Sequence, residues 1–273
     1  MEHRNNGKQA VRIRILSLGN SGTGKSCLIK RYCEKRFSAK YVPTIGIDYG
    51  STIVDVDGRR LSVHFFDTSG SPLFKDVRSE FYHDMQGILL TYSVTDRGSF
   101  NDLESWMDEL KEHLGPQEGW NLVVVVCGTR TDTGGAHGRQ VSETDGRSWA
   151  EKHKFPHILT SAALGVGVTQ AFYTIFVQAL QLKDGMKPQN IAPHIHDPEV
   201  TQAINRLKHG QDDFEKLSLA RRGISKDDIT KSYRKLAGLV HPDKCKEAGA
   251  EEAFKILNQA KNNLLKLISE TTL

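Results

Sequence analysis

Long apolar segments are missing from this chain of 273 residues. No apolar run is much longer than Leu122–Cys127, whereas a helix that spans a membrane needs about 20 apolar residues, so we expect no membrane span. The first residues lack the apolar core of a signal peptide and the glycine that myristoylation requires. The last residues lack a cysteine for prenylation, so we expect no lipid anchor and a soluble protein of the nucleus, the cytoplasm or both.

Cysteine is also scarce. The four residues, Cys27, Cys33, Cys127 and Cys245, form no CxxC pair, which favours reduced thiols over a zinc site or a disulfide framework. A strong excess of one charge is missing as well, since the formal net charge is +4 and the basic residues are dispersed. We therefore expect no nucleic-acid partner.

Strand patterns and helix patterns alternate through the first two thirds of the chain. Val11–Leu18 alternates like a strand and leads into a glycine-rich loop and a helix expected through about Glu34. Asp57-Gly58 separates two alternating runs, which predicts a hairpin. Continuous apolar runs predict two strands buried on both faces, and amphipathic stretches predict three helices. The two runs are 87–94 and 121–128, and the three stretches are 100–114, 142–153 and 168–182. The pattern predicts an α/β fold with a mostly parallel sheet.

The rest of the chain has a different composition. Residues 183–208 are rich in proline and polar side chains, and we interpret them as a linker with nothing to bury. From about Asp212 onward only helical periodicity remains. The sequence therefore predicts a first domain over residues 10–182 and a second, all-helical domain over residues 209–273.

The loop after the first strand has the pattern GxxxxGKS, from Gly19 to Ser26. Glycines in this pattern let backbone N–H groups turn around a phosphate, and the N-terminus of the next helix adds its dipole. Lys25 is expected to reach the β- and γ-phosphates of a nucleotide, and the Ser26 hydroxyl to bind Mg²⁺. The other residues expected to bind nucleotide here are Gly19, Asn20, Ser21, Gly22, Thr23, Gly24 and Cys27.

With this loop and the motifs PTIGIDYG and DTSG, residues 11–182 resemble a small GTPase of the Rab type. The resemblance implies a six-stranded sheet with helices on both faces, and GTP, GDP and Mg²⁺ as ligands. Thr44 and Asp67 would join Ser26 in binding the metal, and the Gly70 amide would contact the γ-phosphate. Both loops would become ordered only with a triphosphate bound, which is how such a switch selects its effector protein. Activating and exchange factors are further implied partners.

The guanine motif of this family, Asn-Lys-x-Asp, corresponds here to Thr129-Arg130-Thr131-Asp132. The Asp132 carboxylate can accept two hydrogen bonds from guanine, and adenine has no such pair of donors, so we predict guanine specificity. Thr129 stands where the family has asparagine. Arg130 retains the aliphatic stem of lysine and adds a planar group that can stack on the base. The remaining implied contacts to the base are Ser161, Ala162 and Phe37, although Phe37 could instead pack in the core.

The family positions its attacking water with a glutamine after the glycine of DxxG, and this chain has Ser71 there, followed by Pro72. Serine is too short to reach both the water and the γ-phosphate. Loss of one preorganised group in an active site typically lowers the rate by about 100- to 1,000-fold, so we expect very slow hydrolysis without a partner. In the alternative, Ser69 or a bound partner aims the water. The resemblance implies the catalytic residues Lys25, Thr44, Gly70 and Ser71.

The helical domain contains the sequence His241-Pro242-Asp243 after a predicted helix. Ser225 is a suitable N-cap for that helix, and Pro242 ends it. One face of the helix is apolar and another is basic, and with the loop the segment resembles a J-domain, which stimulates the ATPase of a DnaK-type chaperone. The domain resembles one truncated after its third helix. The implied chaperone contacts are Lys231, Arg234, Lys235, His241, Pro242 and Asp243.

A Rab-like GTPase followed by a J-domain resembles the Rab-and-J-domain proteins of DnaJ subfamily C. Our leading hypothesis is a GTP-binding switch of weak catalytic power that works in signalling and recruits a DnaK-type chaperone. One alternative is a scaffold that does not hydrolyse its nucleotide and uses it only to stabilise the fold. Another is a dedicated co-chaperone whose GTPase-like domain only targets it.

Overall fold

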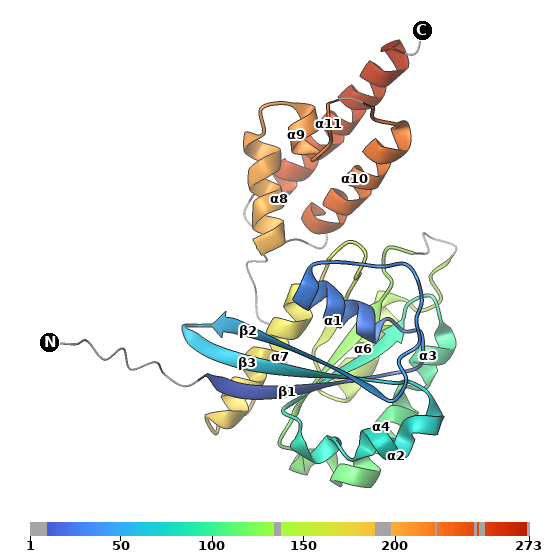
Figure 1. Ribbon diagram of the computed structural model, residues 1–273, viewed down its shortest axis with the longest axis vertical. Helices are drawn as coiled ribbons and strands as arrows, with labels where there is room; N and C mark the ends of the chain where they lie inside the picture. Colours follow the sequence, from blue (N-terminus) through green and yellow to red (C-terminus); the bar gives the residue numbers. More distant parts are fainter. Residues whose placement is uncertain are drawn as a thin grey trace, which may run out of the picture. The chain divides into compact units, whose positions relative to one another are not determined.

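The computed structural model (Figure 1) describes residues 10–133, 138–188, 198–221, 223–242, 245 and 249–271. The chain divides into two units, Met1–Pro193 and His194–Leu273. The first unit contains strands and helices, and the described part of the second is helical.

A six-stranded sheet forms the centre of the first unit, with the strand order β2-β3-β1-β4-β5-β6. All neighbouring strands are parallel except β2 and β3, which form the predicted hairpin around Asp57-Gly58. Every residue of β4 and β5 is buried, as expected for strands covered on both faces. The predicted α/β fold is therefore confirmed. The strands are β1 (Val11–Leu18), β2 (Ile47–Val56), β3 (Arg59–Thr68), β4 (Gly87–Ser93), β5 (Val123–Thr129) and β6 (His157–Leu159).

Helices cover both faces of this sheet (Figure 1). Successive strand residues point to opposite faces, so that Leu89 packs with α1 and α7 while Leu90 packs with α4 and α6. Each face thus has its own apolar core. The helices are α1 (Lys25–Glu34), α2 (Lys75–Ser79), α3 (Arg97–Asn101), α4 (Leu103–Leu114), α6 (Glu143–Lys152) and α7 (Val168–Lys183), and the short 3₁₀ helices are η1 (Pro72–Phe74), η2 (Tyr82–Asp84) and η3 (Gln117–Gly119).

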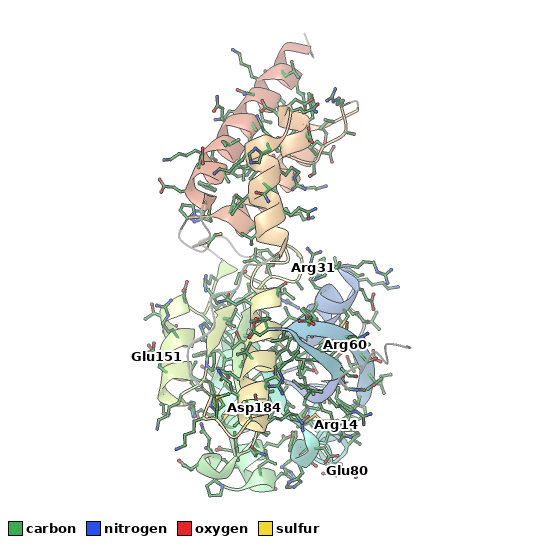
Figure 2. The ribbon with its side chains drawn as sticks, turned by 90° about the vertical axis from the view of Figure 1, so that its left-hand side faces the viewer. Arg14, Arg31, Arg60, Glu80, Glu151 and Asp184 are labelled. Atoms are coloured by element: carbon green, nitrogen blue, oxygen red, sulfur yellow. The ribbon has the colours of Figure 1, made fainter. Side chains whose placement is uncertain are left out.

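Some charged side chains of the first unit lie on its surface. Glu80 and Glu151 are exposed and point away from the ribbon in Figure 2. The ion pair between Arg59 of β3 and Asp184, just after α7, has an N···O distance of 2.5 Å and is more than a third exposed on both sides. Such exposed pairs contribute only about 0–1 kcal/mol to stability. In the described parts of the chain, no helix combines the length and apolar character needed to cross a bilayer.

The second unit contains α8 (Pro198–His209), α9 (Asp213–Lys216), α10 (Lys226–Val240) and α11 (Ala250–Thr271). Ser225 caps α10 as predicted, because its hydroxyl accepts a hydrogen bond from the Asp228 amide at 3.2 Å. The Asp228 carboxylate accepts one in return from the Ser225 amide at 3.0 Å. α10 packs against α11, and both helices bury apolar side chains, among them Leu236 and Leu257.

The prediction of a linker over residues 183–208 was wrong from residue 198 onward, where α8 begins. Val200, Ala203, Ile204 and Leu207 of this helix are buried, and α8 packs against α9, α10 and α11. The spacing of these four residues is that of one helix face, but the nearby prolines favoured a linker in the sequence. Pro198 itself suits the first turn of a helix, where its missing N–H removes no hydrogen bond.

We expect Leu207→Ala to destabilise the second unit, because Leu207 is fully buried. Such a truncation typically costs about 2–5 kcal/mol. Hydrogen exchange of the full chain should become faster in α10 and α11, while the fluorescence of the three tryptophans, all in the first unit, stays unchanged. Gln202→Ala is the matched control, since Gln202 is exposed on the same helix. Unchanged exchange in Leu207→Ala would show that α8 is dispensable.

Candidate functional site

The loop between β1 and α1 is tightly folded around the Lys25 side chain. Gly19 and Gly24 have φ angles of 128° and 97°, which side chains other than glycine rarely adopt. The Lys25 ammonium donates to the backbone oxygens of Gly19 at 2.7 Å and Asn20 at 2.9 Å. Burial lowers the pKa of Lys25 to about 8, although the charge of Asp67 acts in the opposite direction. The site therefore contains a buried amine whose charged form an added anion would stabilise.

The loop after β3 touches this glycine-rich loop through backbone atoms. A Cβ on Gly70 would lie 2.3 Å from the Asn20 carbonyl carbon and from the Ser21 amide nitrogen. No side chain fits there. Ser69 also donates its amide to the Gly46 oxygen at 2.8 Å, which ties the loop to the start of β2.

Three oxygen-bearing side chains meet beside Lys25. The Ser26 and Thr44 hydroxyl oxygens lie 3.0 Å apart, and the Thr44 hydroxyl lies 3.5 Å from Asp67 Oδ2. Ser17 orients that carboxylate by donating to its Oδ1 at 2.8 Å. Hard oxygen ligands of this kind suit Mg²⁺, which usually keeps several waters and needs few carboxylates. Among the described residues no group of three or more His, Cys, Asp or Glu side chains could hold a metal, so a metal here would depend on the hydroxyls.

A cavity of about 350 Å³ is lined in part by Lys25, Ser26 and Thr44. Phe37 lines it and is 44% exposed, so Phe37 is not a core residue. The wall also contains the basic side chains Lys30, Arg36 and Lys40, which the sequence reasoning missed. The only signal for them was the density of lysine and arginine over residues 30–40. The cavity suits an anionic ligand with an aromatic or apolar portion.

The loops predicted to bind a base lie next to the glycine-rich loop. Arg130 Nη2 donates to the Gly22 oxygen at 2.5 Å, and Arg130 lines the cavity. Ser161 donates to Asp132 Oδ1 at 2.6 Å, which brings the 129–132 and 161–162 segments together. Thr129 is buried and donates to the Thr23 oxygen at 2.5 Å, so its hydroxyl joins two loops.

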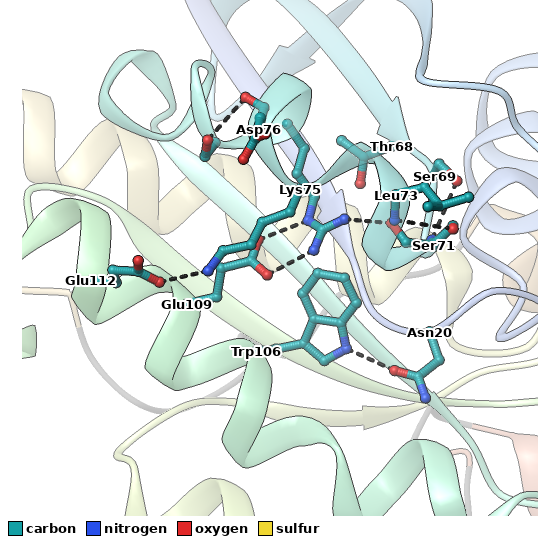
Figure 3. Close-up of polar contacts among 12 residues, drawn as sticks. Asn20, Thr68, Ser69, Ser71, Leu73, Lys75, Asp76, Trp106, Glu109 and Glu112 are labelled. Carbon is teal, nitrogen blue, oxygen red and sulfur yellow. Dashed lines mark hydrogen bonds and ion pairs between the residues drawn. The ribbon is translucent and has the colours of Figure 1, made fainter.

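Ser71 faces the cavity but uses its polar groups within its own loop (Figure 3). Its hydroxyl oxygen accepts the Leu73 amide at 3.3 Å and so caps η1. Its amide donates to Ser69 Oγ at 3.3 Å, and its carbonyl oxygen accepts Arg78 Nη1 at 2.8 Å. The Ser71 side chain therefore contributes to the turn.

Behind Ser71 lies a buried network that the sequence reasoning also missed (Figure 3). Arg78 makes two hydrogen bonds of 2.7 Å to Glu109 of α4, and these side chains are only 4% and 11% exposed. The guanidinium lies 4.6 Å from the centre of the Trp106 ring. Burial raises the pKa of Glu109, but hydrogen bonds from Arg78 and Tyr82 outweigh it and leave the pKa below its ordinary value. Glu109 is therefore ionised at neutral pH.

In the second unit, the predicted chaperone-binding residues lie on and after α10. Lys231, Arg234 and Lys235 are exposed. The His241 ring packs edge-on against Phe254 of α11 with centroids 4.9 Å apart, and the His241 oxygen accepts the Cys245 amide at 2.8 Å. Pro242 is exposed, and Asp243 lies outside the described residues.

Comparison with known proteins matches both units. The Ras family model matches residues 14–181, and the DnaJ domain model matches residues 212–267. The chain is 43% identical over 263 residues to DnaJ homolog subfamily C member 27 of Homo sapiens, covering 95% of each chain. It is 42% identical over 268 residues to the Gallus gallus protein of that name, and 41% identical over 271 residues to that of Danio rerio. Those matches cover 97% and 98% of each chain, respectively.

We expect GTP affinity to fall as the pH rises above about 8, because Lys25 then loses its proton in the empty site. Bound phosphate favours the ammonium form, so binding must take up a proton, and the affinity should fall by up to about tenfold per pH unit. Titration calorimetry at several pH values measures this. Lys25→Met is the control, since the ligand's own titration affects both proteins equally. An equal pH dependence in the two proteins would contradict the assignment of Lys25 to the phosphates of GTP.

Proposed function

This chain belongs to the Ras family of GTPases and carries a C-terminal DnaJ domain, and from this we propose that it is a slowly hydrolysing GTP switch that recruits a DnaK-type chaperone. The observation that carries the slow hydrolysis is the side chain after Gly70, which is a serine engaged in capping η1. From the family resemblance we assign this switch to signalling in the nucleus, the cytoplasm or both. The corresponding partners are an effector protein that binds its GTP form, exchange factors and GTPase-activating factors.

The phosphate end of the cavity suits GTP with Mg²⁺. Lys25 would exchange its two backbone acceptors for the β- and γ-phosphates. Their negative charge would offset the free-energy cost of burying the ammonium group. Ser26, Thr44 and Asp67 would hold the metal, which supplies charge neutralisation at the phosphates. The Gly70 amide would donate to the γ-phosphate, because the missing side chain lets the backbone approach the glycine-rich loop.

The 129–132 and 161–162 segments, which adjoin the cavity at Arg130, suit guanine. Ser161 orients the exposed Asp132 carboxylate, which then accepts from the two adjacent donors on the base. Arg130 is anchored on the Gly22 carbonyl, and its planar group can stack on the ring. The Ala162 amide follows Ser161 and would donate to the base. Phe37 would cover the ring edge from the opposite wall.

Slow hydrolysis is supported by the short side chains of Ser69 and Ser71, whose hydroxyl oxygens accept hydrogen bonds within their own loop. Ser71 caps η1 and is too short to reach both a water and a phosphate. Ser69, the alternative residue for aiming water, has its hydroxyl oxygen engaged by the Ser71 amide at 3.3 Å. Catalysis would then depend on a group that a partner protein supplies.

We expect Ser71→Gln to raise the single-turnover rate of GTP hydrolysis by about tenfold or more, because it restores a side chain long enough to orient water. The gain should stay below the about 100- to 1,000-fold typical of one preorganised group, because the cap on η1 is lost. Ser71→Ala also loses the cap and is the matched control, and it should hydrolyse GTP no faster than the wild type. Rapid phosphate release from the wild type, or a large loss in Ser71→Ala, would contradict this role.

The chaperone-recruiting part of the proposal depends on α10 and the residues after it. Lys231, Arg234 and Lys235 project from an exposed face, which suits an acidic surface on the partner. His241 and Pro242 follow directly at the end of the same helix. The basic face and the loop would therefore contact one partner together.

We expect His241→Gln to abolish stimulation of the ATPase of a DnaK-type chaperone, because the loop loses its ring at the contact. Nucleotide binding should stay unchanged, since the substitution lies in the other unit. His209→Gln is the matched control, as His209 is exposed on α8 of the same unit. Steady-state ATP turnover of the chaperone measures the effect. Undiminished stimulation by His241→Gln would exclude this mechanism.

A further inference from the structure

The side chain of Asn20 connects the glycine-rich loop to α4 (Figure 3). Its Oδ1 accepts the indole Nε1–H of Trp106 at 2.8 Å, and its Nδ2 donates to Asp102 Oδ2 at 2.6 Å. Trp106 is only 6% exposed, and Asp102 directly precedes α4. The loop between β1 and α1 is therefore joined to residues that lie 82 and 86 positions further along the chain.

These two contacts require an amide at position 20. A tryptophan indole only donates a hydrogen bond, and an ionised carboxylate only accepts one. The side chain between Trp106 and Asp102 must therefore offer one acceptor and one donor, as the asparagine amide does. An aspartate at this position would retain the acceptor for the indole but would replace the donor by a carboxylate oxygen, so that its contact with Asp102 would become repulsive.

The backbone of the same residue holds the buried lysine of the loop. The Asn20 carbonyl oxygen accepts from the Lys25 ammonium at 2.9 Å, from the Thr23 amide at 3.3 Å and from the Thr23 hydroxyl at 2.9 Å. The Asn20 carbonyl carbon is also one of the atoms that a Cβ on Gly70 would meet, at 2.3 Å. A shift of residue 20 would therefore move both an acceptor of the lysine and the contact with Gly70.

We propose that Asn20 is a positioning residue for nucleotide binding, and that Trp106 and Asp102 fix it to α4. The proposal rests on the proposed function, in which Lys25 and the Gly70 amide contact the phosphates. The Asn20 side chain holds its own backbone in place, and that backbone sets the position of the Lys25 ammonium. The loop is then ordered before the nucleotide arrives, so binding does not have to supply the free energy of ordering it.

An exchange of donor and acceptor tests this proposal. Asn20→Asp alone sets two carboxylates against each other, whereas Asn20→Asp combined with Asp102→Asn restores the hydrogen bond in the opposite direction and still offers the indole an acceptor. The dissociation rate of a fluorescent GDP analogue from the full chain, with Mg²⁺ present, measures the effect. The single variant should release the analogue about tenfold faster or more, and the double variant should stay within about threefold of the wild type.

Asn101→Asp is the matched control, because Asn101 is exposed at the end of α3 and gains the same charge beside Asp102. It should release the analogue within about twofold of the wild-type rate. If the double variant releases the analogue as fast as Asn20→Asp, the added charge and not the contact is responsible, and the proposal is overturned. A wild-type rate in Asn20→Asp would overturn it as well.

A second pair of variants covers the case in which Asn20→Asp does not fold. Trp106→Phe keeps an aromatic ring and removes the donor to Asn20, and it should speed release by about threefold or more. Trp120→Phe is its control, because that indole donates to the Gly115 oxygen at 2.9 Å instead. Equal rates in these two variants would overturn the proposal. If the wild type retains no guanine nucleotide at all, the proposed function itself fails, which is a distinct result.

Discussion

The site depends on one close approach of two backbones, where residue 70 meets the loop before α1. Only the absence of a side chain allows it, since a Cβ would lie 2.3 Å from two backbone atoms. This contact fixes where β3 ends relative to the glycine-rich loop, and it brings Asp67 near Thr44 and Ser26. The proposed phosphate cradle, the proposed metal ligands and the start of the following segment thus have one geometric origin.

The buried pair of Arg78 and Glu109 adds a second constraint on the same segment. Such pairs contribute little net stability compared with apolar packing, but removing one partner is strongly unfavourable. The pair joins α2 to α4, and loss of either partner would cost more than the pair contributes in net stability. Ser71 fits this arrangement because its short side chain caps η1. In our account, slow hydrolysis and the capped turn after Gly70 both follow from the short side chain of Ser71.

Local patterns predicted most of the fold. The alternation of Val11–Leu18, the glycine-rich loop and the cap at Ser225 each depend on neighbouring residues, and the structure contains all of them. The J-domain resemblance and the Rab-like resemblance were confirmed by matches over both units. The linker prediction was wrong at α8, because it gave the proline content more weight than the helical spacing of the apolar residues. Arg78 and Glu109 are separated by 31 positions and look like surface charges, so only the fold reveals the pair.

The central claim is that the first unit binds GTP and keeps it. The most direct measurement is to purify the full chain without added nucleotide, denature it, and identify the released nucleotide by chromatography. Our account predicts GTP, since it assigns guanine binding to the first unit and slow hydrolysis to Ser71. Recovery of GDP would show that the site hydrolyses its nucleotide. An empty protein would contradict tight binding and would favour a scaffold.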